Sequence, residues 1–449
     1  MSSVPPVPGS NIKPWARPNA HKYCFTNANV IDVKSGKLLK DATVITCDGK
    51  IQSVALASSD PIPADAREID CGGRFLCPGL FDAHVHLCAV PGFQDLSKAF
   101  GNPSDVHLLR QPYTAAQMLH RGFTSIRDCG GAQLAIKEAI EDGVFPGPRI
   151  FISGHALSQF GGHGDLRGSH DHIQCCGGIH HGNSLGRLCN GVPDCMAAVR
   201  EEIRCGADFI KIMGSGGVAS PTDKLEHLQF TAAEIQAMVE CASNAGTFVT
   251  AHAYTVKAIR HCVENGVKGI EHGNFLDFPT AALLAKNQVY LTPTLIAYDQ
   301  MASDQWKGYL PAESQAKNSQ VLKSGLEALR IASDAGVKMC YGSDLLGPLG
   351  SAQTQEFRLR SQILTPLEVL QSATVNPAEM MGCGNSIGQI KEGFQADMIV
   401  LSENPLEDVT VFDDPESCVL GVMKDGRIYK SRWEDLPEDW EIPVRVKYN

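Results

Sequence analysis

The sequence predicts an α/β fold in which a (β/α)8 TIM barrel carries a small β domain built from both chain ends. Three observations support this fold class: a length of 449 residues, eight apolar strand-like runs that alternate with helical patterns, and turn-rich strand segments at the two ends. A chain of this length exceeds what one hydrophobic core holds, which favours two structural units. Repeated strand–helix units in this number are typical of a closed parallel barrel.

The predicted barrel covers residues 78–387. Its helical patterns, such as those at 231–245 and 256–265, begin near a Thr and end near Asn or Gly, as helix caps prefer. Between such patterns lie runs rich in β-branched residues, which are typical of strands. These runs are 80–86, 124–128, 149–153, 209–213, 248–252, 269–272, 289–293 and 338–342.

The small β domain is predicted over residues 21–77 and 388–449. Turn dipeptides such as Asp48-Gly49 and Asp425-Gly426 separate its short strand segments. Residues 1–20 are rich in Pro, Ser and Asn and lack the apolar core of a secretory signal, so we interpret them as an N-terminal tail. The strand segments are 23–26, 30–33, 42–46, 51–54, 396–401, 419–423 and 427–429.

Composition argues against two classes of partner. The net charge of −11, from 39 Lys plus Arg against 50 Asp plus Glu, is opposite to the clustered positive charge of a nucleic-acid surface. No apolar run is long enough to span a bilayer. The 16 cysteines are scattered and several adjoin strand-like runs, which fits buried free thiols in a reducing compartment. We therefore expect a cytoplasmic protein; the sequence leaves a homo-oligomer open.

Two histidines in the first predicted barrel strand are the strongest chemical signal. His84 and His86 stand two residues apart after the turn pair Pro78-Gly79. Because side chains alternate along a strand, both imidazoles point to one face and can bind one metal ion. Other polar residues lie in or at the ends of further predicted strands, whose carboxyl ends meet at one mouth of a barrel. They are Lys211, His252, His272 and Asp344.

Each of these residues alone has an ordinary structural interpretation. Such interpretations are a core histidine bonded to a carbonyl group, a lysine whose head group reaches solvent, or an aspartate that caps a turn. Their joint placement favours a metal site instead. Lys211 lies between Ile210 and Ile212, where burial of a cation is costly and favours the neutral amine. A neutral amine can take up carbon dioxide.

In their order along the chain, these six residues resemble the ligand series of the metal-dependent amidohydrolase superfamily. Segments 76–82 and 388–397 resemble that superfamily too, so the likeness covers about residues 21–435. It implies that the small domain is a composite β-sandwich and that two divalent metal ions, zinc by default, are the cofactors. It further implies that Lys211 is N6-carboxylated and bridges the two ions, with the four histidines and Asp344 as the other ligands.

Two segments are more specific within the superfamily. Residues 209–217 and 159–165 resemble the branch that contains Xaa-Pro dipeptidase-like enzymes, zinc carboxypeptidases and fungal ochratoxinase. This resemblance implies hydrolysis of an amide bond next to a carboxylate in a small-molecule substrate, with a metal-bridging hydroxide as nucleophile. N-acyl amino acids, dipeptides and ochratoxin-like amides all satisfy that description, and the sequence does not choose between them.

The resemblance also implies individual roles. Asp344 would accept the proton of the attacking water and pass it to the leaving amine, and Lys211 would act through its carboxylate. His163 follows a glycine pair and would hydrogen-bond the substrate carbonyl or the forming oxyanion. Tyr254, close after His252, would hold the substrate carboxylate.

The connection at 155–195 is long and has two interpretations. Its histidines and cysteines would bind a further metal, or the segment would form a lid that selects the substrate. The lack of paired CxxC units favours the lid. The residues concerned are His170, His172, His180, His181, Cys175, Cys176, Cys189 and Cys195.

Two other functions stay as alternatives. The first is hydrolysis of a cyclic amide or imidazolone, or deamination, on the same scaffold; Lys211 argues against deamination, which usually uses one metal and no carboxylated lysine. The second is a non-enzymatic scaffold protein, against which the complete set of ligand residues argues.

Overall fold

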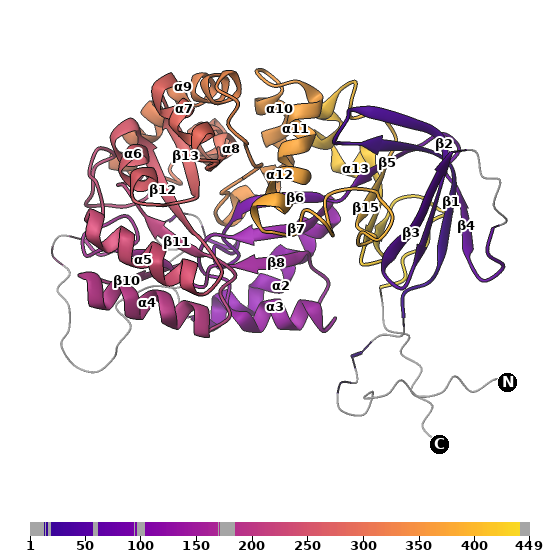
Figure 1. The fold of residues 1–449 in the computed structure, drawn as a ribbon, viewed down its shortest axis with the longest axis horizontal. Coiled ribbons are helices and arrows are strands. Elements are labelled where there is room, and N and C mark those ends of the chain that lie inside the picture. The colour runs from indigo at the N-terminus through magenta and orange to yellow at the C-terminus, as the bar shows by residue number, and fades with distance from the viewer. Residues whose placement is uncertain are drawn as a thin grey trace.

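The strands of the described residues form three sheets (Figure 1). None of the described helices combines the length and the apolar character needed to cross a bilayer. The fold is known from a computed structural model, which describes residues 13, 15–16, 19–56, 62–93, 95–96, 104–168, 170 and 185–440.

The largest sheet combines strands from both ends of the chain, which Figure 1 shows as indigo and yellow segments lying together. Its order is β17-β16-β15-β5-β1-β2-β3, and β4 also pairs with β1. It has its own apolar core, which includes Tyr23, Leu76 and Met398. The strands are β1 (Tyr23–Asp32), β2 (Lys37–Cys47), β3 (Lys50–Leu56), β4 (Arg67–Asp70), β5 (Phe75–Pro78), β15 (Met398–Leu401), β16 (Val419–Lys424) and β17 (Arg427–Ser431).

The segments predicted as separate strands at 23–26 and 30–33 are one strand, β1. Asn27 between them has a φ of 49°, and the register with β2 shifts between Phe25 and Ala28. A bulge therefore absorbs the left-handed residue without ending the strand. The β-sandwich architecture and the domain boundaries predicted above stay predictions.

The middle of the chain forms two parallel sheets, ordered β6-β7-β8 and β10-β9-β11-β12-β13-β14. Seven of the eight predicted barrel strands are present in them. The strands are β6 (Leu80–Val85), β7 (Phe123–Asp128), β8 (Arg149–Ile152), β9 (Ala156–Ser158), β10 (Gly186–Leu188), β11 (Ile210–Met213), β12 (Val249–Thr255), β13 (Gly269–Phe275) and β14 (Tyr290–Thr292).

The eighth predicted strand, at 338–342, forms only an isolated parallel bridge from Met339 to Leu291. The amide of Cys340 donates to the carbonyl of Leu291 at 2.8 Å, and the amide of Ala83 donates to the carbonyl of Tyr341 at 2.7 Å. The segment thus lies between β14 and β6 and links the two parallel sheets. Continuous ladders among the described residues do not join them into one closed sheet, so barrel closure stays a prediction.

Helices follow the strands as the sequence pattern predicts. The patterns at 231–245 and 256–265 are helices α5 and α6, and the side chains of Thr231 and Thr255 accept N-terminal amide hydrogen bonds. The α-helices are α2 (Ser104–His120), α3 (Leu134–Glu141), α4 (Val192–Arg204), α5 (Ala232–Asn244), α6 (Val256–Glu264), α7 (Phe278–Lys286), α8 (Leu295–Ala302), α9 (Ala312–Asp334), α10 (Glu356–Arg360), α11 (Pro366–Ser372), α12 (Val375–Met380) and α13 (Pro415–Cys418); the 3-10 helices are η1 (Asp304–Trp306), η2 (Gly347–Gln355) and η3 (Val409–Asp413).

Gly79 connects the large sheet to the first strand of the parallel sheets. Its amide donates to the carbonyl of Asp397 at 2.9 Å, and a Cβ atom on it would lie 2.1 Å from the Thr124 hydroxyl oxygen. A residue with a side chain would therefore push β7 away from β6. This close approach sets the position of β6, which carries the first two candidate ligands.

Candidate active site

One pocket brings together every residue that the sequence analysis assigned to the site. The other residues lining the pocket are mostly apolar, among them Leu166, Val218, Met301 and Leu346. Within the described part of the chain, the lining of this pocket includes one Lys or Arg residue, which is Lys211. The assigned residues in the pocket are His84, His86, His163, Lys211, His252, Tyr254, His272 and Asp344.

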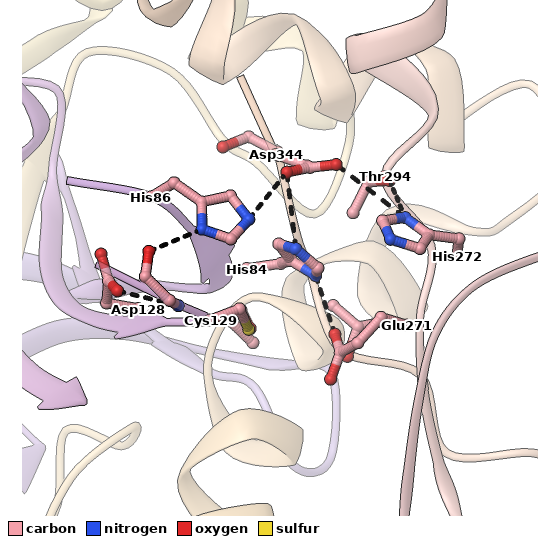
Figure 2. A network of polar contacts seen from close by, with 12 residues as sticks. His84, His86, Asp128, Cys129, Glu271, His272, Thr294 and Asp344 are labelled. Atoms are coloured by element: carbon pink, nitrogen blue, oxygen red, sulfur yellow. Dashed lines mark hydrogen bonds and ion pairs between the residues drawn. The ribbon is translucent and has the colours of Figure 1, made fainter. Parts of the chain in front are cut away.

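The candidate ligands come from different parallel strands. Lys211 lies in β11, His252 in β12 and His272 in β13, and Asp344 follows the 338–342 segment. Nε2 of His84 and Nε2 of His86 lie 3.4 and 3.3 Å from the same Asp344 oxygen, Oδ1 (Figure 2). The two imidazoles predicted to share one face thus converge on one carboxylate.

Hydrogen bonds to Nδ1 orient three of the histidines. Nδ1 of His84 lies 2.9 Å from Glu271 Oε2, and Nδ1 of His86 lies 2.8 Å from the Gly130 carbonyl oxygen. Nδ1 of His272 lies 2.8 Å from Thr294 Oγ1. These acceptors place the imidazole proton on Nδ1 and leave the Nε2 lone pair for a cation.

His252 has the opposite arrangement. Its Nε2 lies 3.2 Å from the carbonyl oxygen of Gly216, so Nε2 carries the proton and Nδ1 keeps the lone pair. Its ring packs edge-on against the His272 ring, with the ring centres 4.5 Å apart. In their neutral forms, all four histidines therefore offer one nitrogen lone pair each.

The charge state of the site suits a cation. Burial and the charge of Lys211 lower the pKa of His84 well below its usual value, and burial lowers the pKa of His272 to about 3. Burial alone would raise the pKa of Asp344, but the neighbouring His84 and His86 outweigh it and hold that pKa well below its usual value. Burial also lowers the pKa of His86, but its contact with Asp344 outweighs burial and raises that pKa above its usual value. Near neutral pH the site thus presents three neutral imidazoles, those of His84, His252 and His272, beside an ionised carboxylate.

Two of the candidate ligands have strained backbones. The φ angles of His272 and Asp344 are 74° and 50°, in the left-handed region. Such a conformation costs about 1 kcal/mol or more and persists where the surrounding structure enforces it, often at functional sites. Here it turns both side chains toward the same pocket.

The ring of His163 stacks on the ring of His252, with the ring centres 4.2 Å apart. Its Nδ1 lies 2.7 Å from Ser220 Oγ, and the Ser220 hydroxyl donates to the carboxylate of Asp223. Because Asp223 takes the hydroxyl proton, Ser220 must accept from Nδ1–H of His163, which leaves a lone pair on Nε2. Burial lowers the pKa of His163, and Asp223 offsets only part of this. In this neutral form, Nε2 accepts a hydrogen bond; it becomes a donor to a carbonyl oxygen only when protonated.

Tyr254 lines the pocket at the carboxyl end of β12. Its ring stacks on the His272 ring with the centres 5.1 Å apart, and its hydroxyl lies 2.8 Å from the hydroxyl of Tyr298. Burial raises the pKa of both phenols well above the usual value, so both keep their protons.

Comparison with known proteins places this chain in a family. The sequence profile of the amidohydrolase family matches residues 75–429. The chain belongs to the amidohydrolase family. This amidohydrolase is 33% identical over 423 residues to ochratoxinase from Aspergillus niger, and the match covers 91% of this chain and 87% of that protein.

Solved structures agree with this membership. The amidohydrolase resembles a prolidase in complex with N-methylphosphonate-L-proline, with a TM-score of 0.86, 40% identity, and coverage of 92% of this chain and 100% of that chain. It also resembles a Xaa-Pro dipeptidase with bound methionine, with a TM-score of 0.82, 27% identity, and coverage of 91% and 100%. The predicted resemblance to the ochratoxinase and Xaa-Pro dipeptidase branch is confirmed, and the chain is a hydrolytic enzyme that acts on amide bonds.

Sequence analysis missed the residues that support the site from behind. Glu271 and Arg127 are fully buried, and Nη2 of Arg127 lies 2.6 and 2.7 Å from the two Glu271 oxygens. The sequence did contain a signal for this pair, because Arg127 and Glu271 are opposite charges that lie in two predicted buried strands. His84, Cys129 and Glu271 also have donor atoms close enough for a metal ion. Arg127 and His84 already form hydrogen bonds with the Glu271 oxygens. We therefore interpret the group of His84, Cys129 and Glu271 as one that orients His84, and not as a metal site. The donor atoms of His84, His272 and Asp344 form the other such group.

The connection at 155–195 contains secondary structure, so it is not a plain loop. Strands β9 and β10 pair in parallel within it, and Leu166 and Leu185 line the pocket. Cys189 and Cys195 are buried in the main apolar core, which argues against a metal role for these two. The other thiols and imidazoles named above for this segment, except the exposed His170, lie outside the described residues. Within the described chain all cysteines are free.

Proposed function

We propose that this amidohydrolase is a binuclear metal-dependent hydrolase that cleaves the amide bond next to a carboxylate. The observation that carries the proposal is the convergence of Lys211 with four imidazoles and the ionised Asp344 in one pocket. Nitrogen donors with a carboxylate suit zinc and similar divalent ions. With this function we propose a closed (β/α)8 barrel over 78–387 and a composite β-sandwich from 21–77 and 388–449.

Lys211 is the proposed bridge between the two ions. Its side chain is 1% exposed, and no described residue forms a hydrogen bond or ion pair with its amine. An unpaired buried cation is unfavourable, and it would repel a metal ion. After losing its proton, the amine would add carbon dioxide and release a second proton, which would replace that cation by an anion with two oxygen atoms. The carboxylated Lys211 would then help to hold the two ions instead of repelling them. We therefore assign N6-carboxylated Lys211 as a ligand.

Asp344 and His163 are the residues proposed to transfer the proton and to contact the substrate. When bound, two divalent ions supply a reactive water and polarise the amide carbonyl. Asp344 is ionised and central among the histidines, so it accepts the proton of the attacking water and returns it to the leaving amine. His163, in its neutral form, accepts a hydrogen bond from the substrate; protonated, it donates to the developing oxyanion.

The pocket walls indicate the substrate class. The apolar side chains around the site favour apolar substituents on both sides of the amide. Lys211, the one Lys or Arg among the lining residues of the described chain, serves as a metal ligand in this proposal. The hydroxyl of Tyr254 is therefore the proposed binding group for the substrate carboxylate. The solved relatives hold N-methylphosphonate-L-proline and methionine, both of which present a free carboxylate. N-acyl amino acids and dipeptides of Phe, Pro or Met, and ochratoxin-like amides, fit this description.

Metal analysis and a substrate panel test the proposal together. We expect about two divalent ions per chain, and release of a free amino acid from N-acetyl-Phe, Met-Pro or ochratoxin A. One ion per chain with ammonia release would favour a deaminase, and ring opening of lactams alone would favour cyclic-amide hydrolysis. A chain that binds no metal and releases no amine would support a scaffold protein.

A further inference from the structure

The phenol of Tyr298 lies between a candidate metal ligand and the candidate carboxylate anchor. Tyr298 is on α8 and 1% exposed. Its hydroxyl oxygen lies 2.9 Å from Nδ1 of His272 and 2.8 Å from the hydroxyl oxygen of Tyr254. The side-chain amide of Asn318, on α9, donates to the Tyr298 carbonyl at 3.0 Å and holds this part of α8 in place.

Counting protons gives this chain of hydrogen bonds a direction. His272 offers Nε2 to the metal in the proposed function, so its Nδ1 carries a proton and cannot accept. That proton goes to Thr294 Oγ1 at 2.8 Å or to the Tyr298 oxygen at 2.9 Å, and Thr294 also donates to Tyr298 at 3.3 Å. Tyr298 has a single proton, and the oxygen of Tyr254 is the one remaining acceptor for it among the described residues. The proton of Tyr254 then has no acceptor in that part of the chain.

We infer that Tyr298 is a positioning residue that directs the O–H of Tyr254 toward the substrate carboxylate and couples this anchor to the metal ligand His272. The inference rests on the proposed function, in which the substrate carries a carboxylate. Tyr298 also lines the pocket, and in this inference it acts through Tyr254. By donating to Tyr254 it polarises the Tyr254 hydroxyl, because hydrogen bonds in a chain strengthen one another in a buried site.

The consequence is selection between a carboxylate and a carboxamide. A charged acceptor gains more than a neutral one from a polarised phenol donor. With the hydroxyl of Tyr298 removed, Tyr254 loses the donor that orients it and its proton turns freely. His272 keeps Thr294 as an acceptor, so the metal ligand stays oriented.

The test uses zinc-loaded protein and equilibrium binding of N-methylphosphonyl-L-phenylalanine and its C-terminal carboxamide, measured by calorimetry. We expect Tyr298→Phe to weaken carboxylate binding about fivefold to tenfold and carboxamide binding by less than twofold, with the zinc content unchanged. Tyr254→Phe should show the same pattern, and the double variant should lose no more than the larger single loss. Tyr23→Phe is the matched control, because it removes another buried phenol, bonded to Asp439 at 2.8 Å in the large sheet. It should bind both ligands as wild type does.

The outcomes separate this inference from the proposed function. If wild-type protein binds both analogues equally, the part of the proposed function that requires a carboxylate on the substrate is wrong. In a second outcome, wild-type protein binds the carboxylate analogue more tightly than the carboxamide, and Tyr298→Phe shows the same preference. This result leaves the proposed function intact and overturns the role of Tyr298. Nitrogen-15 NMR of labelled histidine provides a readout without a substrate: a His272 Nδ1 that carries no proton in the zinc-loaded protein also overturns the inference.

Discussion

The carboxylate of Asp82 holds Ser343 through two hydrogen bonds, from the Ser343 amide at 3.1 Å and from the Ser343 hydroxyl at 2.5 Å. Its Oδ1 also accepts from the amide of His84 at 3.1 Å. Asp82 therefore ties together the two segments that carry His84 and Asp344, which are far apart in the sequence.

Removal of the Ser343 hydroxyl should loosen this tie. In Ser343→Ala, the Oδ2 atom of Asp82 keeps only the Gln353 amide at 2.9 Å, so the segment before Asp344 gains freedom. We expect zinc affinity to fall about 10-fold to 100-fold, the usual cost of losing such support behind a ligand. Competition with a metal indicator measures it. Ser351→Ala, which removes an exposed hydroxyl bonded to the Pro348 carbonyl, is the control. Equal zinc affinities of the two variants would contradict the prediction.

Replacement of Asp344 by Asn separates proton transfer from binding. The amide keeps the shape and one oxygen but cannot accept a proton from water. Turnover should fall about 10²-fold to 10⁴-fold, while the substrate analogue still binds. Single-turnover kinetics and calorimetry measure the two effects. Turnover within tenfold of wild type would exclude Asp344 as the proton acceptor.

Lys211 and Lys317 provide a matched pair for detecting carboxylation. The amine of Lys317 donates to the carbonyls of Gly217 and Ser220, both at 3.0 Å. Because these hydrogen bonds stabilise its ammonium form, we expect no carboxylation of Lys317. We expect carbon-13 NMR of protein grown with labelled bicarbonate to show a carbamate signal in wild type and in Lys317→Ala, and none in Lys211→Ala. Short carboxylic acids should restore part of the activity of Lys211→Ala. A signal that survives in Lys211→Ala would refute the assignment.

The contact between Ser220 and His163 predicts a loss that a conservative replacement reverses. Ser220→Ala removes the acceptor that keeps the His163 proton on Nδ1, so we expect kcat to fall about tenfold with unchanged zinc content. Ser220→Thr keeps the hydroxyl and should restore most of the rate. Steady-state kinetics measure both variants. Equal rates for the Ala and Thr variants would show that the hydroxyl is not used.

Asp413 predicts a pH-dependent stability away from the site. Burial raises its pKa from 3.8 to about 6, although Arg358 lies 3.5 Å away, and its Oδ1 has no hydrogen-bond partner among the described residues. The folded state then binds more protons than the unfolded state between pH 4 and 6. The contribution of protonated Asp413 to the stability of the fold is therefore fully present below pH 4 and is lost as the pH rises through 6. Asp413→Asn should be more stable than wild type by about 1 to 2 kcal/mol at pH 8, with the difference vanishing toward pH 4.

Urea unfolding at several pH values measures this difference. Asp408→Asn is a control of opposite sign, because hydrogen bonds from Thr410 lower the pKa of Asp408. Relative to wild type, that variant should lose stability only as the pH rises toward 4, and the difference should then stay constant between pH 4 and 8. A constant difference between Asp413→Asn and wild type across this range would contradict the pKa shift.

Much of the fold followed from local pattern. Seven of the eight predicted barrel strands are strands, because a run of β-branched residues between helical patterns specifies a buried parallel strand. The eighth, at 338–342, is only a bridge, since it turns at once into the strained backbone of Asp344. Strand β1 was predicted as two pieces because sequence patterns do not distinguish a bulge at Asn27 from a turn.

The sequence by itself predicted which six side chains meet as candidate ligands, because period-2 alternation and the common direction of parallel strands place strand-end residues together without knowledge of their contacts. The prediction of His163 and Tyr254 rested on the resemblance to the family instead. Only the tertiary structure decided how those side chains are held. Glu271 behind His84, Ser220 behind His163 and Tyr298 behind His272 are from 26 to 187 residues away from their partners. Each pairing depends on distances of about 3 Å between atoms of separate elements, which side-chain packing sets and no local pattern encodes.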